Sequence, residues 1–301
     1  MTSSDRIREP ASIDQLLSFT LPDRQARGRI VRLGPVLGRI LAAHDYPHGV
    51  KELLAEALVL TAVMGALLKR DGSQLTLQAQ TEGGVVELLV CDYRDGELRG
   101  YVRFDPDRFA ALGETPALSE LFGGGCLAVT FDLDATGERY QGVVPLEGPS
   151  LAQAVEAYFA RSEQVPTLIR TAIDLRSSRP IAGALLIQHL AEGEEGGERL
   201  DARPDHPEWR HVAIMGGAVE PGELVDPDLS LPDLLWRLFH EEREVRVQPL
   251  AAVSRGCRCS VVHFEDVLAR FPKEDRRDMR DDNGVILVDC AFCSREFAIQ
   301  D

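Results

Sequence analysis

Two short cysteine pairs near the end of the sequence constrain the structure of this chain more than any other feature. Cys257-Arg258-Cys259 and Cys290-Ala291-Phe292-Cys293 are separated by about 30 residues. Each pair presents two sulfur atoms from one turn, and the intervening stretch is long enough to fold back, so that four thiolates surround one tetrahedral ion. Soft sulfur ligands favour zinc over calcium or magnesium. The sequence therefore predicts one Zn²⁺ site with four ligands, Cys257, Cys259, Cys290 and Cys293.

The spacing by itself favours a permanent structural zinc site over a redox-active one, because closed sites with four cysteines are common. A redox role gains support from the size of the terminal segment, residues 252–301, which is too small to rely on its own core. In zinc-finger peptides metal binding supplies about 10–16 kcal/mol, and oxidation of the ligands removes this contribution. Either pair is close enough in sequence to form a local disulfide, Cys257 with Cys259 and Cys290 with Cys293. We therefore expect oxidation to release the metal and unfold the segment.

Other residues near the two pairs have supporting roles. Four thiolates around a divalent ion leave a formal negative charge, which three arginines nearby in the sequence would offset, namely Arg255, Arg258 and Arg295. Positive neighbours also favour the thiolate form of cysteine. His263 lies between the pairs, but four thiolates already complete a tetrahedron, so we expect it to be an ordinary surface or core histidine.

The rest of the chain has the composition of a folded protein. Its 301 residues exceed the length of a typical domain, and 44% of them are hydrophobic and 27% charged, which is an ordinary globular balance. The sequence predicts three parts: an N-terminal domain of residues 1–190, a linker of residues 191–251, and a small cysteine domain of residues 252–301.

The first part combines hairpins with a few helices. Residues 51–68 have the apolar spacing of a helix, and the run from Ala57 to Leu68 predicts a buried helix, because about 20 residues are needed to span a membrane. Alternating apolar and polar residues separated by glycine-containing turns predict strands at 75–79, 85–91, 98–104, 127–134, 139–146, 167–175 and 181–190. Ser150 and Gln153 resemble a capping box that begins another helix, which ends before Pro166. This order of elements predicts an α+β domain with antiparallel hairpins.

The second part begins as a polar segment and ends in a helix. Residues 191–229 are rich in glutamate, aspartate, glycine and proline with little periodicity, which is typical of a solvated linker. Ser230 and Asp233 then resemble a second capping box. The apolar residues that follow share one helical stripe: Leu231, Leu234, Leu235, Leu238 and Phe239. Such a stripe is more often a docked helix than a binding surface.

Charge and motifs argue against several other functions. The net charge of −16 would repel phosphate backbones, and no basic run segregates the positive residues, so nucleic acid is not an expected partner. Residues 1–5 lack the apolar stretch of a secretory signal, which makes the cytosol the expected location, and no membrane association is expected. We find no nucleophile elbow and no phosphate-binding loop, and we expect no enzyme.

The remaining cysteines and two early histidines have structural interpretations. Cys91 lies in a strand pattern and Cys126 follows three glycines, and a buried free thiol is the frequent role of such residues. His44 and His48 flank Asp45, but the neighbouring Tyr46-Pro47 suggests a loop and no further ligand is near in the sequence. We expect both histidines to be loop residues.

The chain resembles the heat shock protein 33 family, the redox-regulated chaperones of bacteria, over nearly its whole length. The cysteine pattern is the strongest mark of this resemblance. Three upstream segments agree with it: Tyr140-Gln141-Gly142-Val143-Val144, Tyr158-Phe159 with Ser162-Glu163-Gln164, and Leu235-Trp236-Arg237-Leu238 with His240-Glu241-Glu242. Together these segments are far more specific than the cysteines alone.

The resemblance implies an N-terminal substrate-binding domain, a regulatory linker and a C-terminal zinc domain. It implies that the reduced, zinc-bound form is inactive as a holdase. Oxidation would form two local disulfides, Cys257–Cys259 and Cys290–Cys293, release zinc, destabilise the linker and expose apolar surface to unfolding client proteins. Activation in the family is accompanied by dimerisation and needs no ATP. The stripe of residues 231–239 would then dock while zinc is bound and become available to clients after release.

Two other functions stay open at this point. A thiol–disulfide oxidoreductase is permitted by the C-x-x-C pair, although such motifs usually begin a helix in a thioredoxin-like unit, and turnover of a dithiol substrate would favour it. A zinc-ribbon adaptor that binds nucleic acid or ribosomes is opposed by the negative charge, and salt-sensitive binding to RNA would favour it.

Overall fold

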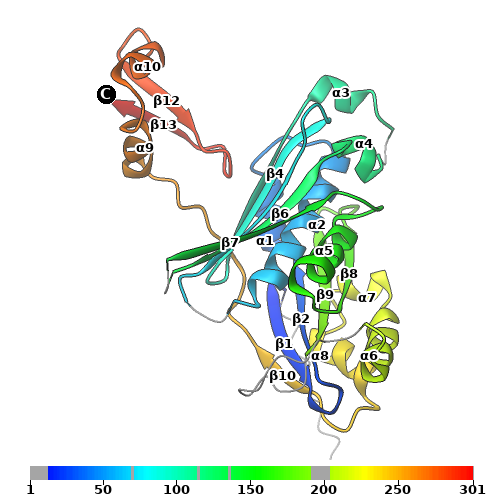
Figure 1. Cartoon of the computed structure of the whole chain (residues 1–301). Coiled ribbons are helices and arrows are strands. Elements are labelled where there is room, and N and C mark those ends of the chain that lie inside the picture. Colours follow the sequence, from blue (N-terminus) through cyan, green and yellow to red (C-terminus); the bar gives the residue numbers. More distant parts are fainter. Residues whose placement is uncertain (1–12, 69–70, 114–115, 135–136, 191–203, 301) are drawn as a thin grey trace, which may run out of the picture.

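The computed structural model describes residues 13–68, 71–113, 116–134, 137–190 and 204–300. Two sheets enclose a long helix, and the C-terminal segment lies beyond the face of the second sheet that is turned away from this helix (Figure 1). Strands and helices are mixed, and nearly all strand neighbours are antiparallel. The predicted α+β class is confirmed.

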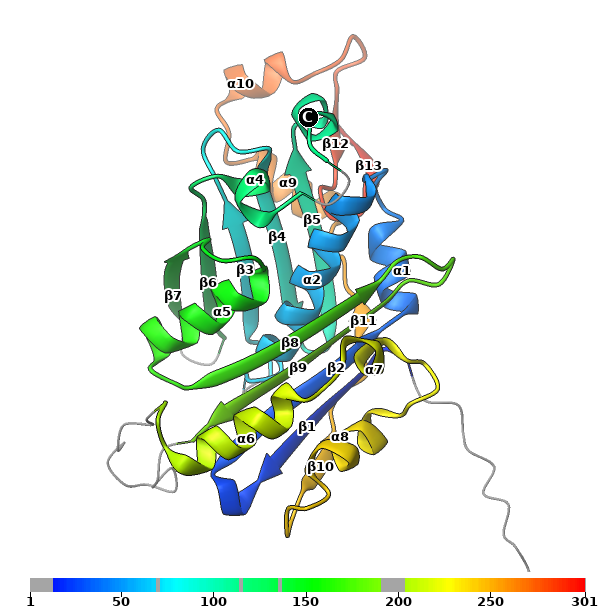
Figure 2. The ribbon, with the colours of Figure 1, turned by 90° about the vertical axis from the view of Figure 1, so that its right-hand side faces the viewer.

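The central helix, α2 (His48–Gly65), is buried on almost every side. It runs between the two sheets (Figure 2), and it can do so because its residues are apolar all round rather than along one stripe. The sequence predicted this buried helix at residues 51–68, so the predicted start and end both lie three residues later than in the structure. A shorter helix, α1 (Pro35–Leu41), precedes it.

The first sheet has the strand order β10-β1-β2-β9-β8. Its strands are β1 (Gln15–Leu21), β2 (Ala26–Leu33), β8 (Thr167–Asp174), β9 (Ile181–His189) and β10 (Arg246–Pro249). A short 3₁₀ turn, η1 (Pro22–Arg24), connects β1 to β2. The sequence predicted β8 and β9, whereas β1, β2 and β10 were not anticipated.

The second sheet has the order β11-β5-β4-β3-β6-β7, and β11 is its one parallel member. Its strands are β3 (Gln74–Gln80), β4 (Val86–Arg94), β5 (Glu97–Phe104), β6 (Cys126–Leu133), β7 (Glu138–Pro145) and β11 (Ser254–Arg255). The five longer strands were all predicted. Asp95 and Gly96 join β4 to β5 with φ angles of 51° and 85°, the positive values that a tight hairpin turn requires.

Three short helices complete the N-terminal part. They are α3 (Pro106–Ala110), α4 (Leu118–Phe122) and α5 (Leu151–Tyr158), and a π-helical turn, η2 (Phe159–Glu163), extends α5. The Ser150 hydroxyl accepts a hydrogen bond from the Gln153 backbone N–H, as expected for the helix start. The chain leaves η2 before Pro166, as the sequence indicated.

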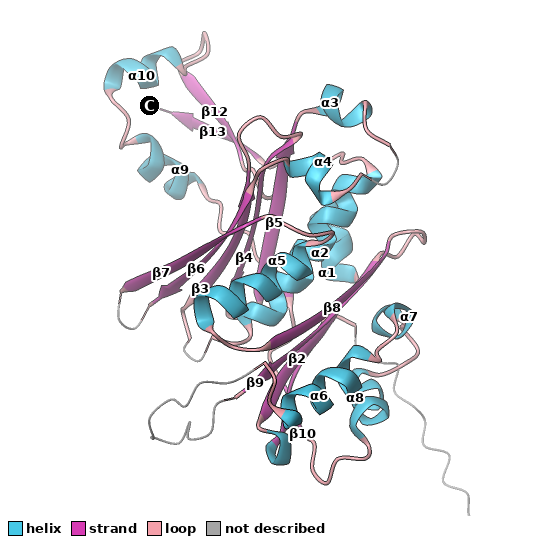
Figure 3. Ribbon diagram, turned by 45° about the vertical axis from the view of Figure 1, so that its right-hand side comes forward, coloured by secondary structure: helices cyan, strands magenta, loops and turns pink. Residues whose placement is uncertain are grey.

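The predicted linker contains more regular structure than expected. Residues 191–203, which include the glutamate-rich stretch, lie outside the described residues. After them come α6 (Pro207–Gly217), α7 (Pro221–Val225) and α8 (Leu231–Phe239), and only α8 was predicted. Figure 3 shows these helices on the side of the first sheet that faces away from α2. The apolar stripe of α8 is fully buried there, so the docked interpretation of the stripe describes this structure.

Two polar contacts fix these helices to the first sheet. Arg32 of β2 is buried and donates three hydrogen bonds of 2.5–2.8 Å to the backbone carbonyls of Glu223, Leu224 and Leu229. This guanidinium supplies donors to two carbonyl groups near the end of α7, where a helix leaves its carbonyls without intrahelical partners, and to one in the loop that follows.

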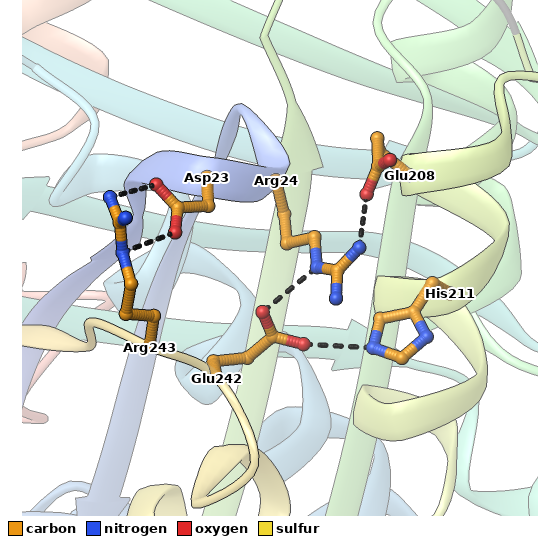
Figure 4. Close-up of polar contacts among 6 residues, drawn as sticks. All are labelled: Asp23, Arg24, Glu208, His211, Glu242 and Arg243. Atoms are coloured by element: carbon orange, nitrogen blue, oxygen red, sulfur yellow. Dashed lines mark hydrogen bonds and ion pairs between the residues drawn. The ribbon is translucent and has the colours of Figure 1, made fainter.

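The second contact is a cluster of charged side chains at the far end of the same sheet (Figure 4). Arg24 of η1 pairs with Glu208 of α6 and, at 2.8 Å, with Glu242 beyond α8. The Glu242 carboxylate also lies 2.8 Å from the His211 ring of α6. Three elements that are distant in sequence thus meet at one half-buried guanidinium.

The C-terminal segment has very little core of its own. Its elements are α9 (Val261–Leu268), α10 (Lys273–Asp278), β12 (Val285–Asp289) and β13 (Glu296–Gln300). The apolar cluster of the segment contains three buried side chains, Leu268 of α9, Ile286 of β12 and Ile299 of β13, and α10 has no buried residue. Among the described residues of the whole chain, no helix combines the length and the apolar character needed to cross a membrane.

Candidate metal centre

Two turns bring the cysteine pairs together. Cys257 and Cys259 follow β11 directly, and the second pair occupies the turn between β12 and β13. In that turn the Cys290 carbonyl accepts hydrogen bonds from the backbone N–H groups of Cys293 and Ser294. The short hairpin therefore fixes how the second pair presents its thiols.

The four thiols form one compact site. All four sulfur atoms lie within 4.8 Å of one another. The sulfur of Cys257 lies 3.3 Å from that of Cys259 and 3.5 Å from that of Cys290, and the sulfurs of Cys259 and Cys293 are also 3.5 Å apart. A tetrahedral ion with metal–sulfur bonds of about 2.3 Å requires sulfur separations of about 3.8 Å. These four residues, which the sequence grouped together, therefore fit a metal ion with only small adjustments.

The local environment gives the thiols different acidities. Burial opposes ionisation of Cys257, but hydrogen bonds from the backbone N–H of Cys259 and from the neighbouring thiols lower its pKa to about 7. Burial raises the pKa of Cys259 and of Cys290, and the hydrogen bonds that they donate to neighbouring sulfurs raise it further. Cys257 is thus the most acidic of these three thiols. A bound cation favours the thiolate form of every ligand.

The other residues singled out in the sequence lie as follows. His263 is exposed on α9 and stays outside the sulfur cluster, as expected. Cys91 is fully buried on β4, as expected, and Cys126 is half-buried at the start of β6. His44 lies in a loop, but His48 is the first residue of α2, so the loop interpretation of His48 was wrong. Pro47 and Gly49 on either side of it concealed the helix start.

Sequence reasoning missed the residues of the N-terminal part that contact the cysteine turns. The His44 ring lies 3.0 Å from the Ser294 hydroxyl. Asp92 of β4 lies 3.8 Å from the Arg258 guanidinium, and burial, followed by the nearby Arg99, lowers the pKa of Arg258. These residues are more than 150 positions from the first cysteine pair, and no local pattern marks them.

Fold and site together define a class of protein: an α+β body, a docked helical segment, and a small terminal module organised around four thiols that can hold a metal ion. Comparison with known proteins identifies the family. The sequence model of the family described as Hsp33 protein matches residues 14–300. The chain belongs to the Hsp33 family, and it is a chaperone of the stress response.

Individual relatives agree with this assignment. The 33 kDa chaperonin of Caulobacter vibrioides (strain NA1000 / CB15N) is 40% identical over 296 residues, which cover 95% of this chain and 94% of the relative. The 33 kDa chaperonin of Shigella boydii serotype 4 is 34% identical over 94% of this chain and 91% of the relative. The crystal structure of the 33 kDa chaperonin of Thermotoga maritima matches with a TM-score of 0.76 at 21% identity, and it covers 95% of both chains. This last likeness supports the fold.

Proposed function

We propose that this chaperone is a redox-regulated holdase that binds unfolding proteins without ATP and is inactive while its four thiols are reduced and hold one Zn²⁺. The observation that carries the proposal is the combination of a four-sulfur cluster with a module that has three buried apolar side chains. Zinc is the proposed ion because an all-sulfur tetrahedral site suits it better than the hard cations. The ligands would be Cys257, Cys259, Cys290 and Cys293.

The proposed signal is removal of the ligands by oxidation. Two local disulfides would form, Cys257–Cys259 and Cys290–Cys293, and each bond forms from two thiolates with the release of two electrons. For each disulfide, one hydrogen peroxide molecule accepts these electrons, takes up two protons from solvent and is reduced to two water molecules. The zinc-bound cysteines are suitable reactants, because the thiolate rather than the thiol is the form that peroxide oxidises. Metal binding of about 10–16 kcal/mol in comparable small modules would be lost with the thiolates.

The proposed response is release of the linker, residues 191–251, whose helices α6, α7 and α8 are docked on the first sheet. The segment before the first two cysteines contributes β10, which pairs with β1, and β11, which pairs with β5. Unfolding of the zinc domain, residues 252–301, would therefore weaken contacts with both sheets. Release would uncover the stripe of α8 together with the apolar face of the first sheet beneath it. Unfolded proteins are the partners of such a surface, and exposed apolar area of this kind would also favour a homodimer of the oxidised form.

The remaining parts of the proposal concern reaction and place. The four thiols would act once per oxidation event as a sensor, so we propose no enzymatic turnover. The substrate-binding part is residues 1–190, and the cytoplasm is the proposed location, because thiols there are kept reduced until stress occurs.

The decisive experiment compares the reduced, zinc-loaded protein with the peroxide-treated protein. Light scattering follows aggregation of a chemically denatured client, and a chromogenic chelator records zinc release in parallel. We expect suppression of aggregation only after oxidation, with release of about one zinc per chain. Equal suppression in both states would refute the redox switch.

A further inference from the structure

The structure assigns a docking site for the metal module to the outer face of β4 and β5. Its occupants are Arg258, which the C-x-C pair encloses, and Phe292, one of the two residues that the C-x-x-C pair encloses. We infer that this docking holds the cysteine turns in their metal-binding arrangement and slows metal loss. The inference rests on the proposed function for its zinc, but the docking is a separate claim about two parts of one chain.

The first observation is that β11 delivers the C-x-C pair to the edge of the second sheet. The backbone N–H groups of Ser254 and Gly256 donate to the carbonyls of Gly96 and Leu98 at 2.9 and 3.0 Å. A β-carbon on Gly256 would lie 2.4 Å from the Cβ of Glu97, so only glycine permits this close approach. The chain is therefore held against β5 one residue before the first cysteine.

The second observation concerns Phe292, which lies inside the C-x-x-C pair. Its ring meets the ring of Tyr101 edge-on, with centroids 5.0 Å apart and an angle of 84°. The guanidinium carbon of Arg99 lies 3.9 Å from the centroid of the same ring. Both contacts have the geometry of attractive interactions of an aromatic ring. A residue that ligates nothing thus occupies a site formed by two side chains of β5.

The third observation concerns Arg258, which lies inside the C-x-C pair. Asp92 of β4 binds Arg99 at 2.6 Å and lies 3.8 Å from the Arg258 guanidinium. The Asp92 side chain is only 5% exposed, and its carboxylate faces two guanidinium groups. This carboxylate therefore orients Arg99 for Phe292 and attracts Arg258 at the same time.

These contacts depend on the arrangement of the cysteine turns. The residue between two ligands takes its position from the ligands on either side, so both enclosed side chains reach the sheet together only while the four sulfurs stay in one cluster. A third contact, from the Ser294 hydroxyl to the His44 ring at 3.0 Å, comes from the residue directly after the last cysteine. Docking and metal binding therefore favour each other, as linked equilibria require.

The test measures zinc loss from the four cysteines after changes that leave all four in place. Tyr101→Ala, Phe292→Ala and the double variant are prepared in the full-length chain, together with the control Tyr140→Ala, which removes an exposed tyrosine from β7 at the opposite edge of the same sheet. Each reduced protein is loaded with Zn²⁺, and the rate of transfer to excess chromogenic chelator is recorded. Circular dichroism and thermal unfolding establish that each variant is folded.

We expect Tyr101→Ala and Phe292→Ala each to accelerate zinc transfer about three- to tenfold, which is the scale of an aromatic and a cation–π contact. The double variant should be no faster than the faster single one, because both changes remove the same contact. Tyr140→Ala should match the parent chain. A parental rate in Tyr101→Ala, or independent multiplication of the two effects, would overturn the inference.

A second measurement keeps the two proposals distinguishable. Zinc content before the transfer reports on the proposed function alone. Hydrogen exchange of the amides of residues 254–256 reports on the docking, and Phe292→Ala should accelerate it in the zinc-loaded protein. Unchanged exchange in that variant would refute the docking even if the redox switch is correct.

Discussion

Phe239 offers the most direct way to separate docking of the linker from chemistry at the thiols. This last residue of α8 is fully buried, and its ring centroid lies 5.7 Å from that of Phe19 on β1. The Phe19 ring in turn covers Gly28, where an added β-carbon would lie 2.1 Å from the ring. The Phe239 ring therefore packs on the Phe19 ring, which in turn packs on the backbone of β2 at Gly28.

The expected cost of Phe239→Ala follows from this packing. Removing a buried phenylalanine side chain costs about 3–5 kcal/mol, and most of it should fall on the docked state of α8, because the undocked helix does not make the contact. Taking about 3 kcal/mol, the population of the undocked linker rises on the order of a hundredfold. The four thiols are unchanged, so the variant should keep its metal.

Two assays check this prediction on the reduced, zinc-loaded protein. Hydrogen exchange of the α8 amides should accelerate, and light scattering should show partial suppression of client aggregation without any oxidant. Trp236→Ala is the matched control, because this residue of the same helix is 68% exposed and its removal should change stability by less than about 0.5 kcal/mol. Faster exchange without client binding would refute the inhibitory role of docking, and unchanged exchange would refute the packing argument.

Three further predictions concern the charged cluster and the thiols. Burial opposes ionisation of Glu242, but the hydrogen bond from Arg24 lowers the pKa of this carboxyl, and Arg24→Gln removes that donor. A lowered carboxyl pKa stabilises the fold above the ordinary pKa of about 4.5, and this stabilisation disappears as the pH falls through the lowered pKa. Because the Arg24 side chain remains 30% exposed, the free energy of unfolding of the variant, measured in urea, should fall by only about 1 kcal/mol at pH 7. Near pH 3 the variant and the parent chain should be equally stable. An equal loss of stability at both pH values would contradict the role of the Glu242 carboxylate. Cys290→Ser should lower zinc affinity strongly and uncouple client binding from oxidant, and an unchanged zinc content would contradict the ligand assignment. Peptide mapping of the peroxide-treated protein should recover Cys257 linked to Cys259 and Cys290 linked to Cys293, whereas a Cys257–Cys290 link would disprove the local pairing.

The parts of the fold that the sequence predicted are those in which a local pattern decides the structure. Strict alternation specified β3, and the Asp95-Gly96 turn specified the hairpin of β4 and β5. By contrast, β2 carries Arg27, Arg29 and Arg32, and the burial of Arg32 is understandable only once the carbonyls of α7 are placed above it. The helices α6 and α7 are short, and their apolar residues are recognisable as one face only against the first sheet.

The same division applies to the site. Cysteine spacing alone was enough to group the four thiols, because ligand geometry dictates that spacing. The surface beneath them was not predictable, because Asp92, Arg99 and Tyr101 belong to an ordinary hairpin whose outward side chains carry no sign of a partner. Contacts between distant parts of a chain leave no periodic signal in either part.

The segment between α8 and the first cysteine pair shows why these distant contacts matter for a switch. Its strand β10 pairs with β1, then the Val253 N–H donates to the Asp14 carbonyl at 3.1 Å, and β11 pairs with β5. The carboxylate of Asp14 also accepts hydrogen bonds from the backbone N–H groups of Gly34 and Val36 at the start of α1, so the segment contacts a residue that fixes this helix start. Cys257 lies near the start of the zinc domain, so a change at this residue can affect the linker without involving the rest of that domain. Cys257 lies two residues beyond β11, which is hydrogen-bonded to the N-terminal part, and loss of this short strand would expose the end of β10 directly.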